Sequence, residues 1–272
     1  MGAAGNSLAE GGGPYRIHIT GAARSGTTLV LALTMTCFEI DAAVAHECRL
    51  WRAPVRGRRV VLTKQPRDEA FAMRLARLDP RLHVIYMLRD PREVVVSIHG
   101  SAPDRYWSDL PDWRRSVKAA RRYFGHPRVH VVRYDELVRD PDGVQQRLAA
   151  AMPFLKMLRP FSRFHEAAAL EHEQWRAAMR TVRPPSPEAL GSWRQHLPRL
   201  KAQLAAHGDI AAELIELGFE KDSTWLSLLD GIEPDDTRSR PPADTLRRRF
   251  NHGWRDFVGA LGYAAQRAGL RG

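Results

Sequence analysis

Apolar, β-branched runs alternate with segments of helical periodicity over the first half of the chain. The pattern predicts strands over residues 15–20, 42–45, 59–63, 83–88 and 129–133. It predicts helices over residues 27–38, 69–78, 91–100 and 113–124. Strands that are apolar almost throughout indicate a parallel sheet that is covered on both faces. The predicted fold class is therefore α/β, a three-layer sandwich with a central parallel sheet.

The second half of the chain has a different pattern. From Asp142 onward we find only helical periodicity, interrupted by the proline-rich stretch 184–187 and by residues 230–236. We predict a disordered leader over residues 1–13, one α/β domain over 14–220 and a helical, basic C-terminal extension over 221–272. The extension either packs on the domain or reaches a partner.

Composition narrows the classes of protein to consider. A chain of 272 residues with 44% hydrophobic content can bury the core of one domain. The two cysteines, Cys37 and Cys48, have neither a disulfide framework nor the spacing of a zinc site. The Gly-rich N-terminus lacks the pattern of a signal peptide, and no apolar run is long enough for a membrane helix. We therefore expect a soluble, cytoplasmic protein with peripheral membrane contact at most.

The formal net charge of +11 fits nucleic acid, an acidic membrane surface or a small polyanionic ligand. However, the basic residues are dispersed, and we find no helix-turn-helix, zinc-finger or RNA-binding motif. A basic nucleic-acid-binding protein is therefore only the third hypothesis for the function, and we expect no nucleic-acid partner.

A loop of small residues follows the first predicted strand, and two hydroxyl residues then open the first helix. Such a loop directs backbone amides and a helix dipole at one anion. The sequence departs from the phosphate-binding pattern G-x-x-x-x-G-K-[ST], because Thr27 stands at the lysine position and Arg24 lies within the loop. The missing lysine weakens the case for a cleaved triphosphate. A Gly-rich turn without any ligand is the alternative.

A second candidate anion site follows the strand predicted over residues 83–88. Arg89 ends this strand, Pro91 opens the next helix, and Ser97 lies about two turns into that predicted helix. Arg89 and Ser97 can therefore meet over one anion. Asp90 either caps the helix or holds magnesium, as in a P-loop kinase or NTPase that uses ATP. That enzyme class is the second hypothesis for the function.

Four motifs in this order resemble the sulfotransferases that use 3′-phosphoadenosine 5′-phosphosulfate (PAPS). They are A-x-R-S-G-T-T at residues 22–28, L-R-D-P-R-x-x-x-x-S at 88–97, V-V-R-Y-D-E-L at 131–137 and G-S-W-R-Q-H-L at 191–197. The resemblance covers about residues 14–220. Cytosolic small-molecule sulfotransferases carry a K-T-H motif where this chain has T-K-Q-P at 63–66. The chain therefore resembles the carbohydrate- and tyrosine-modifying branches instead.

The resemblance implies that PAPS is the cofactor, that adenosine 3′,5′-bisphosphate is the product, and that no metal is required. The loop would bind the 5′-phosphosulfate, Arg89 and Ser97 the 3′-phosphate, and Tyr134 would lie near the adenine. A late segment with Ser192 and Trp193 would close over the nucleotide. The implied cofactor-binding residues are Ala23, Arg24, Ser25, Gly26, Thr27, Thr28, Arg89, Ser97, Tyr134, Ser192 and Trp193.

The resemblance also implies transfer of a sulfuryl group to an acceptor hydroxyl by in-line displacement, with a carboxylate as general base. The acceptor that we expect is a carbohydrate or glycolipid. Glu47 matches the place of the glutamate base in the carbohydrate- and tyrosine-modifying branches; His46 is the competing candidate, and neither residue is the third possibility. Lys64 either stabilises the sulfuryl group during transfer or only ends its strand.

Overall fold

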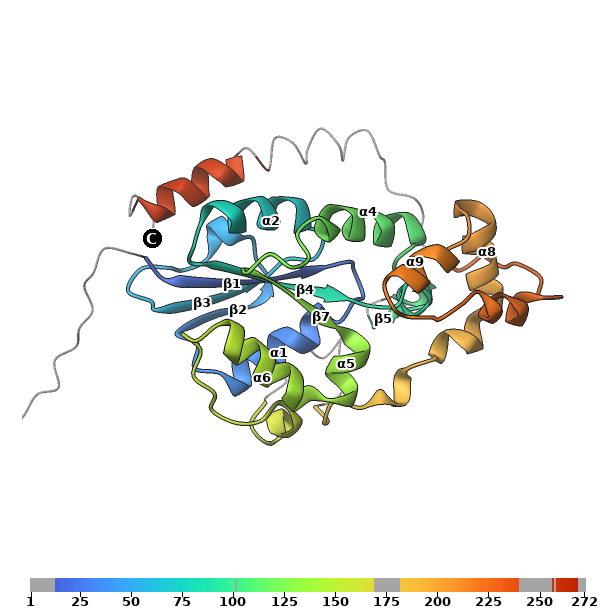
Figure 1. Ribbon diagram of the computed structural model, residues 1–272, viewed down its shortest axis with the longest axis horizontal. Helices are drawn as coiled ribbons and strands as arrows, with labels where there is room; N and C mark the ends of the chain where they lie inside the picture. Colours follow the sequence, from blue (N-terminus) through green and yellow to red (C-terminus); the bar gives the residue numbers. More distant parts are fainter. Residues whose placement is uncertain (1–12, 101, 169–181, 240–255, 257, 269–272) are drawn as a thin grey trace, which may run out of the picture.

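A computed structural model describes residues 13–100, 102–168, 182–239, 256 and 258–268 (Figure 1). Its centre is a five-stranded sheet with the order β2-β3-β1-β4-β7, in which every neighbouring pair is parallel. The strands are β1 (Tyr15–Gly21), β2 (Ala42–Glu47), β3 (Val60–Lys64), β4 (Leu82–Leu88) and β7 (Val129–Arg133). The predicted α/β class is confirmed. The predicted leader lies outside the described residues except for Gly13.

Helices cover both faces of the sheet (Figure 1). One face carries α1 (Thr27–Cys37), α5 (Tyr134–Arg139) and α6 (Pro141–Ala151), and the other carries α2 (Glu69–Leu78) and α4 (Leu110–Arg121). Successive side chains of β4 point to opposite faces of the sheet. Ile85 and Met87 join the core on the α1 side. Val84 and Tyr86 join the core under α2 and α4. This two-sided burial explains why the strand is apolar on both faces.

The helix predicted over residues 91–100 is wrong beyond its first turns. Helix α3 (Pro91–Val95) ends early, and β5 (Ile98–His99) pairs with β6 (Ala102–Tyr106) in a small antiparallel sheet. The Arg24 guanidinium donates to the Ile98 carbonyl oxygen at 3.2 Å, which is a bond that a continuing helix would use internally. Ser97 therefore follows the helix and does not lie within it.

The later part of the described chain is helical, as predicted. It contains α8 (Leu197–His207), α9 (Ala211–Glu216) and the short 3₁₀ helices η2 (Phe161–Glu166), η3 (Pro187–Ala189), η4 (Ser192–His196) and η5 (Thr224–Leu229); η1 (Leu50–Arg52) lies earlier in the chain. Trp193 and Trp225 pack with Val95 and Leu110 in a third hydrophobic cluster. Among the described helices, none combines the length and apolar character needed to cross a lipid bilayer.

The described residues after position 220 pack on the α/β body. The Arg238 carbonyl oxygen accepts a hydrogen bond from the backbone N–H of Tyr106 at 2.9 Å. The helical residues 258–267 lie beside α2 (Figure 1), where the Tyr263 hydroxyl donates to the carboxylate of Asp79 at 2.7 Å. Gln266 accepts a hydrogen bond from the buried Arg16 guanidinium at 2.8 Å. These residues therefore pack on the domain, which is one of the two alternatives predicted for the extension.

Candidate functional site

The turn between β1 and α1 depends on glycine at Gly26. Its φ of 100° lies in the left-handed region, and a Cβ atom there would stand 2.6 Å from Cδ2 of Tyr134. Arg24 also has a positive φ, of 71°. The aromatic ring and the loop backbone therefore touch directly, with no room for a side chain between them.

The N-terminus of α1 retains groups that can bind an anion. No side chain among the described residues caps this helix, so its first amide groups remain available to a ligand. The Ser25 hydroxyl is buried and has no hydrogen-bond partner within the described part of the chain. Three features thus coincide at one place: a helix dipole over 11 residues, free amides and an unsatisfied hydroxyl.

The Lys64 side chain brings an ammonium group to the loop, which has no lysine of its own. Its Nζ donates to the Thr28 hydroxyl at 3.1 Å, although the two residues lie on different elements. The lysine is only 4% exposed, and burial lowers its pKa, with Glu47 acting in the opposite direction and Arg24 in the same direction. Parallel pairing of β1 with β3 opposes Lys64 to Ile19 and so brings the ammonium group to the loop. The sequence pattern missed this arrangement because it is set by strand order.

Arg24 links the loop to the chain segment after α3. Its Nε donates to the Ser97 hydroxyl at 3.0 Å. Arg89 in turn donates from Nη1 to the Arg24 carbonyl oxygen at 2.9 Å. The expected meeting of Arg89 and Ser97 therefore occurs through Arg24, which touches both.

The Arg89 guanidinium contacts Tyr134 and Glu93, and one of its nitrogens has no hydrogen-bond partner in the described part of the chain. The guanidinium lies 4.2 Å from the centre of the Tyr134 ring, and Nη2 lies 3.5 Å from the Glu93 carboxylate. Its Nε is buried and lacks a hydrogen-bond partner in the residues described. A buried, unpaired N–H on a permanent cation is costly unless an anion satisfies it. The geometry thus fits an anionic ligand at this point.

A cavity of about 350 Å³ lies beside the loop and Arg89. Seven of the predicted cofactor-binding residues line it: Arg24, Gly26, Thr27, Thr28, Arg89, Ser97 and Tyr134. The sequence interpretation missed Arg183, Pro184, Pro185, Ser186 and Ala189, which line it as well. These residues belong to a proline-rich stretch without periodicity, so only their closeness to the late G-S-W motif could have indicated them.

The late motif itself lies behind the cavity wall. The Ser192 hydroxyl donates to Glu93 at 2.7 Å, and the backbone N–H of Gly191 donates to the same carboxylate at 2.6 Å. Trp193 is 2% exposed and packs edge-on against Trp225. This placement gives no support to closure of Ser192 or Trp193 over a nucleotide. Ala23 and Ser25 are buried loop residues that are not among those lining the cavity.

Asp90 acts as a helix cap. Its carboxylate accepts from the backbone N–H of Arg92 at 2.8 Å and pairs with the Arg92 guanidinium at 2.7 Å. Glu220 binds the same guanidinium, which lies 4.4 Å from the centre of the Trp193 ring and 4.8 Å from that of Trp225. Asp90 is thus engaged by a buried arginine, and within the described residues no group of three or more metal-ligating side chains gathers.

Glu47 lies beside Lys64, at the end of the neighbouring strand. The two residues are register partners, and the Gln65 amide donates to the Glu47 carboxylate at 3.4 Å. The Glu47 charge raises the pKa of Lys64 against the effect of burial. His46 is exposed and has no contact of this kind among the described residues. Of the two candidate bases, Glu47 is the one beside Lys64.

The fold is α/β, and the candidate site, a glycine-containing loop together with Arg89, lies at the carboxyl ends of the strands. Residues 35–153 match the sequence model described as "Sulfotransferase family". The resemblance to sulfotransferases that the motifs indicate is thereby confirmed over this segment, which contains Arg89, Ser97 and Tyr134. The segment begins within α1, so the loop and Arg24 precede it. No curated protein sequence matches the chain.

Several solved sulfotransferase structures are similar to the chain at low sequence identity. A mouse sulfotransferase complexed with PAP is 12% identical over 74% of this chain and 84% of that one, with a TM-score of 0.45. A sulfotransferase from Alicyclobacillus acidocaldarius is 19% identical over 78% of this chain and 98% of that one, with a TM-score of 0.38. The sulfotransferase domain from the curacin biosynthetic pathway is 16% identical over 52% and 74%, also with a TM-score of 0.38. These similarities are too distant to carry an argument about activity.

Proposed function

We propose that this protein is a sulfotransferase that moves a sulfuryl group from PAPS to an acceptor hydroxyl. One observation carries the proposal: Arg89, whose Nε has no hydrogen-bond partner among the described residues, and the loop before α1 line the same cavity, with the Tyr134 ring in contact with both. An aromatic ring between two anion sites suits a nucleotide that carries phosphates on both its 5′ and its 3′ oxygens. The residue types present therefore fit PAPS.

Each residue has a distinct task in this proposal. The α1 amides, Arg24 and the Thr28 hydroxyl hold the 5′-phosphosulfate, and Arg89 and Ser97 hold the 3′-phosphate. When bound, PAPS supplies a sulfuryl group on a good leaving group. Lys64, at hydrogen-bond distance from Thr28, stabilises the negative charge that grows on the departing phosphate oxygen.

Glu47 is the proposed general base. As the acceptor oxygen bonds to sulfur, the bond between sulfur and the 5′-phosphate oxygen breaks, and the acceptor proton passes to the Glu47 carboxylate. The exposed position of Glu47 leaves it accessible to a hydroxyl that approaches from solvent. A carbohydrate or glycolipid acceptor rests on the resemblance to the branches that use a glutamate base.

Thermal unfolding with two nucleotides tests the nucleotide class. We expect adenosine 3′,5′-bisphosphate to raise Tm without magnesium and to raise it more than ATP with magnesium does. The variant R89A should lose at least about tenfold in affinity for the bisphosphate, since it loses a charge-assisted contact. A larger stabilisation by ATP with magnesium would contradict the proposal and favour a P-loop kinase or NTPase.

A second experiment tests the base. We expect E47Q to lose turnover with PAPS and a panel of hydroxyl acceptors while it binds the bisphosphate as the wild type does. The neighbouring variant H46Q is the matched control and should remain active. Activity in E47Q, or its loss in H46Q alone, would remove Glu47 from this role.

A further inference from the structure

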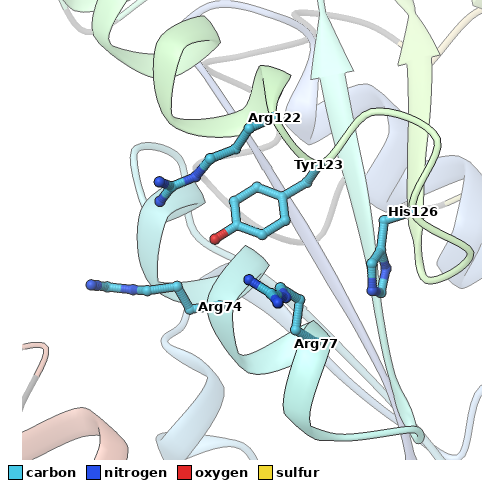
Figure 2. A pocket seen from close by; sticks show the side chains of 5 residues that line it. All are labelled: Arg74, Arg77, Arg122, Tyr123 and His126. Atoms are coloured by element: carbon cyan, nitrogen blue, oxygen red, sulfur yellow. The ribbon is translucent and has the colours of Figure 1, made fainter.

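A second cavity, of about 360 Å³, is lined by the side chains drawn in Figure 2. Its lining residues come from the C-terminal part of α2, the end of α4 and the loop before β7, and they are Arg74, Arg77, Arg122, Tyr123 and His126. Because α2 leads into β4 and this loop leads into β7, the cavity lies where these strands begin. The site described above lies where the strands end, so the two are separate.

The cavity gathers positive charge that acidic groups do not balance. Arg74 is paired with Asp256 at 3.0 Å. For Arg77 and Arg122, the described part of the chain offers no carboxylate partner. Figure 2 shows the Arg122 side chain above the Tyr123 ring and the Arg77 guanidinium below it. Arg122 lies 5.0 Å from the centre of that ring. Two permanent cations therefore face one opening.

Arginines at the end of a helix often only satisfy its last carbonyl groups. Here that task is already done by Arg128, whose Nε donates to the Ala76 carbonyl oxygen at 2.7 Å and whose Nη2 donates to that of Arg77 at 3.3 Å. At the end of α4, the backbone N–H of Tyr123 bonds to the Ala120 carbonyl oxygen at 2.8 Å. Helix capping therefore does not account for the side chains of Arg77 and Arg122.

His126 adds a neutral donor to the same cavity. Its Nδ1 accepts a hydrogen bond from the backbone N–H of Arg128 at 3.2 Å, so the ring proton is on Nε2. Burial, together with the charges of Arg128 and Arg77, lowers the pKa of His126. The imidazole is therefore an uncharged N–H donor at neutral pH, and the depressed pKa agrees with a positive potential in the cavity.

We propose that this cavity binds a phosphate monoester through Arg77 and Arg122. Two fork-shaped guanidinium groups match the oxygen pairs of a tetrahedral dianion, and the two uncompensated charges equal that of the ligand. The Tyr123 hydroxyl and His126 Nε2 supply further donors. The monoester can belong to a free small molecule or to a lipid headgroup, and both offer the same chemistry to the arginines.

Arginine side-chain NMR tests the site directly. The Nε–Hε signals of Arg77 and Arg122, assigned by single variants, are followed while inorganic phosphate is added at constant ionic strength, with chloride as the reference anion. We expect saturable shifts in the wild type and in R89Q, in which the other site is impaired. The variant R77Q/R122Q should lose roughly tenfold or more in phosphate affinity, because it loses two charge-assisted contacts to the anion. The variant R52Q/R56Q removes two exposed arginines elsewhere and should bind phosphate normally.

Vesicle sedimentation distinguishes the two sources of the monoester. Vesicles of phosphatidylcholine with phosphatidic acid, which carries a monoester, are compared with vesicles of matched charge that contain phosphatidylserine. A preference for phosphatidic acid that R77Q/R122Q abolishes supports a lipid source, and phosphate binding without it supports a soluble ligand. The proposal is overturned if neither phosphate nor phosphatidic acid binds. It is also overturned if R77Q/R122Q binds as well as R52Q/R56Q.

Discussion

Replacing Asp68 with asparagine should stabilise the protein at neutral and alkaline pH. The side chain is 5% exposed, and burial raises its pKa from 3.8 to about 7, with smaller contributions from Asp256 and Glu69. Neighbouring positive charges do little to stabilise the ionised Asp68 carboxylate. His18, 3.6 Å away, is neutral because burial lowers its pKa to about 3, and Arg49 is 3.7 Å away, beyond hydrogen-bond distance.

The sign and the size of the effect follow from linkage. Below pH 3.8 both the folded and the unfolded chain hold the Asp68 proton, so the group has no effect on stability. As pH rises from about 4 to about 7, the unfolded chain releases the proton while the folded chain keeps it, and stability falls. A pKa change of about three corresponds to roughly 4 kcal/mol, an upper bound because the Arg49 charge favours the ionised form. The uncharged amide of the substituted side chain would remove this loss.

Urea unfolding of wild type and D68N from pH 4.5 to 8.5 measures the effect. The difference in free energy of unfolding should be small at pH 4.5 and grow to at most about 4 kcal/mol at pH 8. The buried His83 and His130 change the stability of both proteins alike and cancel in the difference. His18, which contacts Asp68, has a pKa of about 3 in the folded wild type and so stays neutral there over this pH range. The control D104N removes a carboxylate that is 71% exposed. A D68N protein that is no more stable than wild type at pH 8, or a difference already complete at pH 4.5, would refute the reasoning.

Three further substitutions probe the loop and its partners. G26A should lose about 1–3 kcal/mol of stability in urea and bind the bisphosphate more weakly, whereas G57A, with a φ of 68° but open space around it, should lose less. E93Q removes a negative charge 3.5 Å from Arg89 and should tighten bisphosphate binding about threefold in calorimetry; weaker binding would mean that Glu93 orients Arg89. K64M should lower kcat about 100-fold with a smaller loss of bisphosphate affinity, and an unchanged kcat would exclude Lys64 from the transfer step.

Local patterns predict most of the fold. The bounds expected for α2 and β7 agree with the structure, because both elements have a strong period and clear ends. The main error is the helix continued through Ser97. The three valines before it are buried and fit a helix or a strand equally well. Where the helix has ended, Ser97 and Ile98 bond to Arg24, a residue far away in sequence.

The site is predictable from the sequence only where its residues directly follow predicted strands. The loop and Arg89 each follow a strand, and parallel strands end at the same edge, so their meeting can be inferred. The contact of Lys64 with Thr28 depends on which strand lies beside β1, and a single sequence does not state strand order. The proline-rich wall of the cavity, including Ser186, has no period from which its position could be inferred.

The contact of Lys64 with Thr28 has a consequence for how such proteins can change over generations. A phosphate-binding loop that contains its own lysine can be inherited, duplicated or fused as one short piece of gene. Here the loop lies between β1 and α1, Lys64 ends β3, and Arg89 lies between β4 and α3. Recombination within this gene would separate these three parts, so we expect the segments to be inherited together. The loop sequence itself can then depart from the pattern G-x-x-x-x-G-K-[ST].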